Sequence, residues 1–293
     1  ILCILRFKKS EPETILEWNF PKLAPNKFQF EKENMPWVAV SLLCGFSALA
    51  CEVVWTRILV FGIGSTVYSF SLMLANFLFG ITVGGLLIVP FFKRNLNFRI
   101  LLALFQLVIG IYIVFSIYKS EWILSAFFRP LKMESPLSEF WIHVRNASAL
   151  MFVPTLLFGM SFPVLTHLVT RDSANIGGSL GIIYAVNTFG GILGSLVAGY
   201  LLLPKVGSQQ TLTFLVMLNF LTAVLLFATS SYFVGIIRKG IVVSMSILLI
   251  LILSLIPDNL LRGIFLRNSL GKKQPENLVY LNEGLTTTVA VFN

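Results

Sequence analysis

Charged residues are scarce in this sequence. They make up 12% of its 293 residues, whereas hydrophobic residues make up 56%. Soluble globular proteins carry about 25% charged residues, so this composition excludes an ordinary soluble domain. Long runs without any charge indicate instead an all-α polytopic membrane protein that crosses the lipid bilayer several times.

Catalytic and metal-binding patterns are lacking as well. The chain has two histidines and three cysteines. Cys3, Cys44 and Cys51 lie among apolar neighbours, which indicates packing residues rather than a disulfide or a metal site. No carboxylate pair has a useful spacing in a polar segment, and no glycine-rich nucleotide loop follows a predicted strand. We therefore assign no catalytic residue, no metal and no cofactor to this chain, and the sequence leaves enzyme activity undecided.

The net charge of +9 does not by itself indicate a nucleic-acid partner. The basic residues cluster beside hydrophobic segments, where membrane topology and anionic lipid explain them more simply. We expect the lipid bilayer as a partner and no nucleic acid. No secretory signal is evident, because the apolar start before Arg6, Lys8 and Lys9 is too short for one.

Uncharged runs predict about seven transmembrane helices. A helix needs about 20 apolar residues to cross about 30 Å of hydrocarbon. The run over residues 58–92 is too long for one crossing, so we place a turn at residues 62–65. Residues 1–35 are predicted to be a basic linker or juxtamembrane segment. The helices are expected at residues 36–61, 65–91, 100–118, 146–170, 177–204, 209–230 and 240–257.

In the predicted seven-helix topology, lysine and arginine are more numerous on the side of the membrane where the N-terminus lies than on the opposite side. The bias predicts a cytoplasmic N-terminus in a cell (inner or plasma) membrane. An odd number of helices then places the residues after Pro257 outside, although Arg262, Arg267, Lys272 and Lys273 favour the inside. The sequence leaves this conflict open.

Two charges, Glu52 and Arg57, lie in or near the end of the first predicted helix. A charge beside hydrocarbon costs roughly 2.5–3.5 kcal/mol on insertion scales, so such residues have partners or mark function. Five positions correspond to about 140° around an ideal helix, so the two side chains do not stack directly. Three interpretations stay open, namely a structural clamp at the membrane boundary, a substrate or proton site, and a solvated helix end without a role.

Two predicted helices carry a stripe of one asparagine and two small residues at four-residue spacing. The stripes are Asn76, Gly80, Gly84 and Asn187, Gly191, Ser195. Small residues let membrane helices approach closely, and asparagine can hydrogen-bond between them. The two helices run in opposite directions in the predicted topology, as an inverted repeat requires. The alternative is that glycine is simply frequent in membrane helices.

His167 lies near the inner end of the fourth predicted helix. Packing or hydrogen bonding is the simpler interpretation of a lone histidine at this depth, and ligand binding is the alternative. The candidate binding residues are therefore Glu52, Arg57, Asn76, Asn187 and His167. Gly80, Gly84, Gly191 and Ser195 are expected to pack.

The C-terminal segment changes character. Residues 277–293, NLVYLNEGLTTTVAVFN, contain β-branched residues on both sides of a Glu-Gly pair, which predicts two short strands joined by a turn. An isolated hairpin is marginally stable in water. We therefore expect residues 258–293 to be a linker and the first strands of a further, truncated domain.

Four segments in order resemble the membrane-bound spermidine synthase-like family, in which a major-facilitator-like bundle is fused to a spermidine synthase-like domain. They are CEVVWTRILVFGIGSTVYSFSLMLANFLFGITVGG, PTLLFGMSFPVLTHLV, GSLGIIYAVNTFGGILGSLVAGYLLLPKVGSQQTL and YLNEGLTTTVAV. The resemblance implies a bundle like half of a major facilitator. Glu52, Trp55, Arg57 and Asn187 match family motif positions whose roles are unassigned.

The resemblance also implies that an aminopropyltransferase-like domain follows the bundle. In soluble spermidine synthases such a domain transfers an aminopropyl group from decarboxylated S-adenosylmethionine to putrescine. The nucleotide-binding and acidic motifs are absent from this chain, so no catalytic residue is carried over, and decarboxylated S-adenosylmethionine concerns only a downstream domain. The expected role is to anchor such a protein and to supply or bind a polyamine-type molecule. The alternatives are a small-molecule transporter and an assembly module whose glycine faces form a homo-oligomer, both without enzyme activity.

Overall fold

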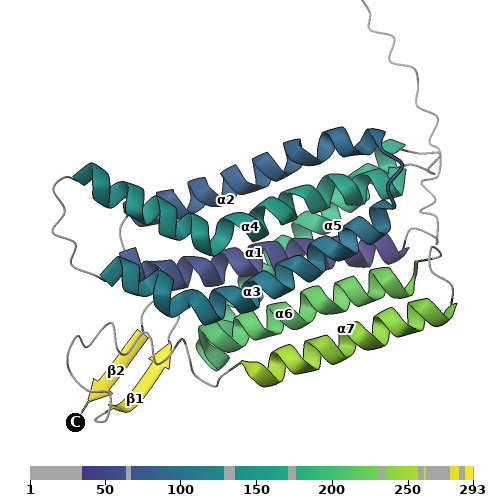
Figure 1. Ribbon diagram of the computed structural model, residues 1–293. Coiled ribbons are helices and arrows are strands. Elements are labelled where there is room, and N and C mark those ends of the chain that lie inside the picture. Colours follow the sequence, from purple (N-terminus) through teal and green to yellow (C-terminus); the bar gives the residue numbers. More distant parts are fainter. Residues whose placement is uncertain are drawn as a thin grey trace, which may run out of the picture.

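The computed structural model describes residues 35–63, 67–128, 136–170, 176–230, 235–256, 261, 278–283 and 288–292. These residues form a helical bundle with a two-stranded hairpin at one end (Figure 1). Residues 1–34, and with them nearly all of the expected basic linker, lie outside the described part. The helices are α1 (Met35–Ile63), α2 (Val67–Ile88), α3 (Phe98–Phe128), α4 (Pro136–Thr170), α5 (Ile176–Leu196), α6 (Leu203–Ala228) and α7 (Gly235–Leu255). A 3-10 segment (Val89–Lys93) follows α2, and a π-helical segment (Val197–Leu202) joins α5 to α6.

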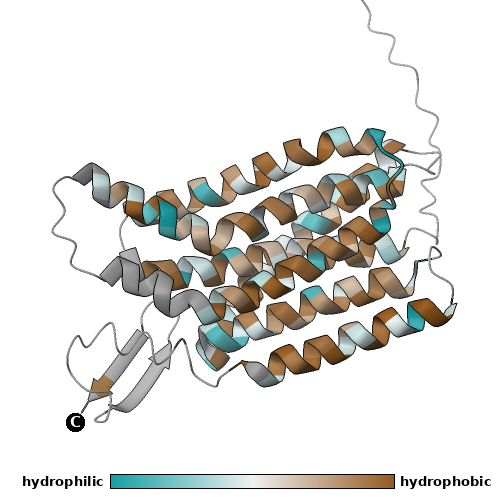
Figure 2. Cartoon of the chain, in the orientation of Figure 1, coloured by the Kyte–Doolittle hydropathy of each residue, from teal (hydrophilic) through white to brown (hydrophobic). Residues whose placement is uncertain are grey.

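Six helical segments of the described chain are long and apolar enough to cross a membrane. One of them, Ile176–Ala228, has 53 residues and contains both α5 and α6. A straight helix of that length would measure about 80 Å, far more than a bilayer requires. Gly207 interrupts it with φ 81° and ψ 173°, a conformation that glycine adopts readily because it has no Cβ. Apolar positions dominate the helices, and a hydrophilic turn follows α2 (Figure 2).

Two helices are longer than the uncharged runs predicted. α3 continues to Phe128 and α4 begins at Pro136, so both extend into the region between the third and fourth predicted helices. The prediction ended each helix at the first charges, but a helix satisfies its own backbone hydrogen bonds and can continue beyond the hydrocarbon. α4 also continues through Pro154 and Pro163.

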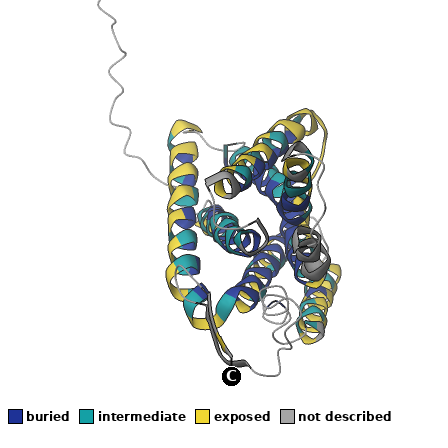
Figure 3. Ribbon diagram, turned by 90° about the vertical axis from the view of Figure 1, so that its left-hand side faces the viewer, coloured by how far each residue is buried: buried dark blue, intermediate teal, exposed yellow. Residues whose placement is uncertain are grey.

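The helices pack mainly in pairs. α1 packs along α5, α2 along α4, and α3 along both α6 and α4, whereas α7 contacts mainly α6 at the margin. Figure 3 shows buried positions on the faces that the helices turn toward one another and exposed positions on the outer faces. The largest fully buried side chains include Trp55 and Phe220. Only 6% of the residues in the candidate membrane span of α7 are buried.

The hairpin consists of β1 (Leu278–Glu283) and β2 (Thr288–Phe292). The strands are antiparallel, with Glu283 opposite Thr288 and a register irregularity between Leu278 and Tyr280. β1 contacts α6. The hairpin lies at the end of the bundle opposite the start of α1 (Figure 1). Whether these strands open a larger domain stays a prediction.

Candidate functional site

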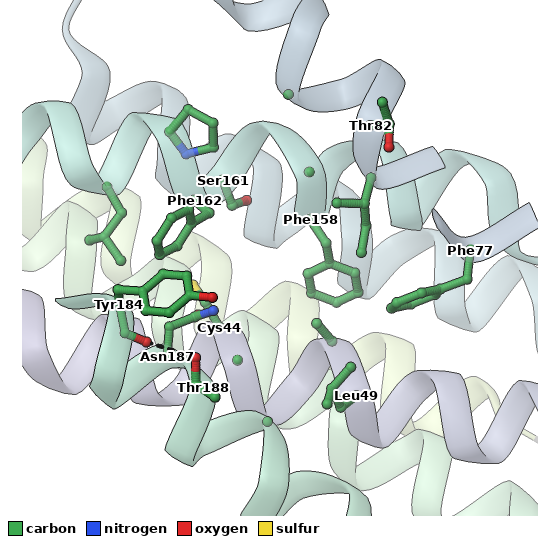
Figure 4. A pocket seen from close by; sticks show the side chains of 18 of the residues that line it. Cys44, Leu49, Phe77, Thr82, Phe158, Ser161, Phe162, Tyr184, Asn187 and Thr188 are labelled. Carbon is green, nitrogen blue, oxygen red and sulfur yellow. Dashed lines mark hydrogen bonds between the residues drawn. The ribbon is translucent and has the colours of Figure 1, made fainter. Parts of the chain in front are cut away.

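A cavity of about 580 Å³ lies between α1, α2, α4 and α5 (Figure 4). Its volume falls within the roughly 300–1,000 Å³ that small-molecule sites occupy. Aliphatic and aromatic side chains form most of its wall, and no charged residue lines it. The polar lining residues are Cys44, Thr82, Ser161, Tyr184, Asn187 and Thr188.

Glycines allow α1 and α5 to touch backbone to backbone beside this cavity. A Cβ atom at Gly194 would lie 2.8 Å from both the Cα and the carbonyl carbon of Phe46. A Cβ atom at Gly190 would lie 3.0 Å from the carbonyl carbon of Leu42. In the opposite direction, a Cβ atom at Gly45 of α1 would overlap the carbonyl oxygen of Asn187. Such contacts are open only to residues without a side chain.

α2 and α4 approach each other in the same way. A Cβ atom at Gly84 would lie 2.9 Å from the carbonyl carbon of Leu156, and one at Gly159 would lie 2.7 Å from the Cα of Ile81. Gly80 faces the Thr155 side chain. The cavity thus lies between two tightly packed helix pairs, α1 with α5 and α2 with α4, whose mutual contacts are sparser.

The two ends of the cavity differ in chemistry. At one end, the Tyr184 and Phe162 rings meet edge to face, with centroids 6.0 Å apart and an interplanar angle of 72°. Asn187 lies beside Tyr184 at this end, and neither its amide nor the Tyr184 hydroxyl is hydrogen-bonded to a described residue (Figure 4). At the other end, Phe158 and Phe77 lie near Leu49 (Figure 4). The cavity therefore has a polar end, at Tyr184 and Asn187, and an aromatic end, at Phe77 and Phe158.

Gln106 of α3 forms hydrogen bonds to two residues of the cavity wall without being a lining residue itself. It is buried, and its amide nitrogen donates hydrogen bonds to Cys44 Sγ at 3.3 Å and to Ser161 Oγ at 3.4 Å. Cys44 belongs to α1 and Ser161 to α4, so this contact joins the two helix pairs. Gln106 was not among the predicted binding residues, although an amide within an uncharged apolar run was a usable signal.

Of the predicted binding residues, Asn187 alone lines the cavity. Glu52 and Arg57 lie on α1, each half-buried, and no ion pair joins them in the described part of the chain. The Glu52 carboxylate makes neither a hydrogen bond nor an ion pair with any described residue. A local Glu52–Arg57 clamp is therefore not formed here.

Asn76 joins α2 to α4 outside the cavity. Its Nδ2 donates to Ser148 Oγ at 2.9 Å, and the Ser148 hydroxyl can donate to Asn76 Oδ1 at 3.2 Å. Asn76, Gly80 and Gly84 therefore face α4 together.

The second stripe, Asn187, Gly191 and Ser195 on α5, does not face a single neighbouring helix in the way that the Asn76 stripe faces α4. Gly191 lies against the Leu49 side chain, but Ser195 donates its hydroxyl within its own helix to the Ile192 carbonyl at 3.0 Å. Gly190 and Gly194 make the closest contacts instead, one position before the expected pair. Gly190 and Gly194 were not among the predicted packing residues, because the prediction placed the stripe of this helix in register with the Asn76 stripe. The four-residue spacing of Gly190 and Gly194 was the available signal.

His167 packs between two aromatic rings at the other end of the bundle from the hairpin. Its ring centroid lies 4.8 Å from that of Phe92 and 4.8 Å from that of Phe98. It does not line the cavity. The geometry is that of a packing residue joining α4 to the turn between α2 and α3.

Within the described ranges, no group of three histidine, cysteine or acidic residues could hold a metal ion. Comparison of the chain with family models, curated proteins and solved structures gave no match. The resemblance to spermidine synthase-like proteins therefore stays a prediction. The cavity and the residues around it carry the functional argument.

Proposed function

We propose that this chain is a membrane domain that binds a small molecule in the cavity between α1, α2, α4 and α5, and that it anchors a spermidine synthase-like protein. The cavity is the observation that carries the binding function. It combines a volume suited to a small ligand with an apolar wall and a few unpaired polar groups at one end. The anchoring role rests on the motif resemblance and on the paired strands after α7.

The bundle crosses a cell membrane seven times, with α5 and α6 as separate crossings. The break at Gly207 supports this count, because each arm is then long enough for one crossing and too short for two. The start of α1 and the hairpin consequently lie on opposite sides of the membrane, as they lie at opposite ends of the bundle (Figure 1).

Basic residues favour the cytoplasm for the bundle end where α1 begins. Among the described residues, this end carries five of them: Lys93, Arg94, Arg99, Arg238 and Lys239. The hairpin end carries four: Arg57, Lys119, Arg145 and Lys205. The positive-inside rule then places the hairpin outside. A transferase there would be separated from cytoplasmic nucleotide substrates, which favours ligand binding by the bundle over a purely anchoring role.

The assembly interpretation has less support. Gly80, Gly84 and Gly191 pack against neighbouring helices of the same chain, so these faces are occupied. They are not available to a second copy without opening the bundle. A homo-oligomer would need another surface.

A cavity-filling pair of variants tests the binding function. Ile192 lines the cavity and is 50% exposed, whereas Ile247 lies on α7 outside the cavity and is 60% exposed. Protein reconstituted in liposomes is assayed for binding and uptake of radiolabelled spermidine and a panel of small amines and alcohols. We expect Ile192→Trp to abolish the signal of the wild type and Ile247→Trp to retain it. Absence of any signal in the wild type, or equal behaviour of the two variants, would contradict the proposal.

The anchoring role has a separate assay. The intact native protein is purified and tested for aminopropyl transfer from decarboxylated S-adenosylmethionine to putrescine. If the bundle only anchors, Arg57→Ala lowers protein abundance and leaves the activity per molecule unchanged. Lack of transfer by the intact protein would remove the enzyme-anchor interpretation and leave the binding function standing.

A further inference from the structure

Glu52 continues the face of α1 that lines the cavity. Gly45, Ala48 and Leu49 are lining residues, and Glu52 follows them by seven, four and three positions. Residues at these spacings lie on one face of a helix, with about 5–6 Å between Cβ atoms of neighbouring turns. The carboxylate therefore lies one helical turn beyond the cavity wall.

This carboxylate has no counter-charge among the residues that the structure describes. Glu52 is half-buried and, among the described residues, makes no hydrogen bond or ion pair. The lining of the neighbouring cavity contains no charged residue. Because Glu52 follows Leu49 on α1, the negative group lies beyond the end of the cavity marked by Leu49, Phe77 and Phe158 (Figure 4).

The opposite end offers neutral hydrogen-bonding groups. Asn187 and Tyr184 lie there, close to Cys44 (Figure 4). Cys44 and Glu52 are eight residues apart on α1, which corresponds to about 12 Å along the helix axis. The site thus runs from a neutral polar end, past aromatic rings, to a single carboxylate.

We propose that the cavity binds a hydrophobic monocation, a small amine with an apolar or aromatic body, and that Glu52 is its counter-ion. The inference rests on the proposed function and narrows its ligand class. A polyamine such as spermidine carries several ammonium groups, and all but one would lie in an apolar space without a partner. Unpaired buried charge is strongly unfavourable, so the site discriminates against polycations.

A cysteine placed beside Glu52 tests the charge. Ala48→Cys is introduced into the full chain with Cys3, Cys44 and Cys51 replaced by serine, and the protein is reconstituted in nanodiscs. Rates of modification are measured with cationic 2-aminoethyl, neutral methyl and anionic 2-sulfonatoethyl methanethiosulfonate. The measurement is repeated with Glu52→Gln, and with Glu52→Asp as the variant that keeps the charge. Each protein must be monodisperse before its rates are compared.

We expect Glu52→Gln to lower the ratio of cationic to anionic rate by about tenfold or more, because opposite unit charges within about 7 Å attract strongly where water is scarce. Glu52→Asp should retain most of the preference. A ratio unchanged by Glu52→Gln overturns the counter-ion role. If the neutral reagent also fails to react, the cavity is closed to small molecules and the proposed function itself fails.

Protection experiments test the ligand class with the same cysteine. The probes are tryptamine, its neutral analogue tryptophol, in which a hydroxyl replaces the ammonium, and spermidine. We expect tryptamine to slow modification by the neutral reagent at least several-fold more than the other two, and Glu52→Gln to abolish this difference. Equal protection by tryptamine and tryptophol, stronger protection by spermidine, or no protection by tryptamine overturns the inference. Equal protection would identify a site for neutral apolar molecules, such as lipid chains.

Discussion

The contact of α5 with α1 at Gly194 leads to a quantitative prediction. A Cβ atom there would lie 2.8 Å from the Cα and the carbonyl carbon of Phe46, whereas ordinary van der Waals contact begins at 3.4 Å. Gly194→Ala therefore requires the two backbones to separate by about 0.6 Å or more. The atoms in the way belong to a helix backbone, so no rotamer change can relieve the overlap.

Two effects of opposite sign set the magnitude. Overpacking a well-packed interior costs typically about 1–3 kcal/mol, and replacing glycine by alanine within a helix returns about 0.8–1.0 kcal/mol. Gly181 of the same helix has nothing within 4 Å of its added Cβ. Gly181→Ala should therefore raise the free energy of unfolding through helix propensity alone, which makes it the matched control. The two variants should differ by about 1–3 kcal/mol in their free energy of unfolding, with Gly194→Ala the less stable.

The assay is reversible unfolding in mixed micelles with increasing dodecyl sulfate, followed by circular dichroism. Wild type, Gly194→Ala and Gly181→Ala are compared under one set of conditions. Equal unfolding free energies for the two variants would show that α1 and α5 do not touch at Gly194, and would refute the backbone-contact reasoning.

Three further outcomes follow from the same structure. Asn76→Leu should lower stability by about 0.6 kcal/mol, a typical interhelical hydrogen bond in membranes, and should have no additional effect in a Ser148→Ala background; full additivity would contradict the bond. His167→Ala should lose about 1–3 kcal/mol from two ring contacts, whereas His167→Phe should keep most of it; equal losses would argue against aromatic packing. Single cysteines at exposed Leu96 and Val291 should react with an impermeant maleimide from opposite sides of the membrane, and labelling from one side would refute the seven-crossing topology.

The membrane class could be predicted from composition and uncharged runs. Spans are recognisable from sequence because the bilayer imposes a minimum length of apolar helix. Helix ends were less predictable, as α3 and α4 show, because a helix can continue into polar surroundings without losing its backbone hydrogen bonds.

The candidate site was only partly accessible to sequence reasoning. Asn187 was selected and lines the cavity, but Asn76 and His167 were selected for the same polar character and lie elsewhere. Residue type and depth in the membrane do not say which way a side chain faces. That direction depends on which helices pair.

The sequence by itself determined that this chain is a bundle of apolar helices with a few charges and amides at restricted depths, because hydrocarbon excludes most polar groups. Only the tertiary structure decided that Gly45, Gly190 and Gly194 join α1 to α5 while Gly84 and Gly159 join α2 to α4. These contacts depend on residues far apart in the chain, and no local pattern specifies the partner of a small-residue face. The same pairing leaves the cavity between the two helix pairs.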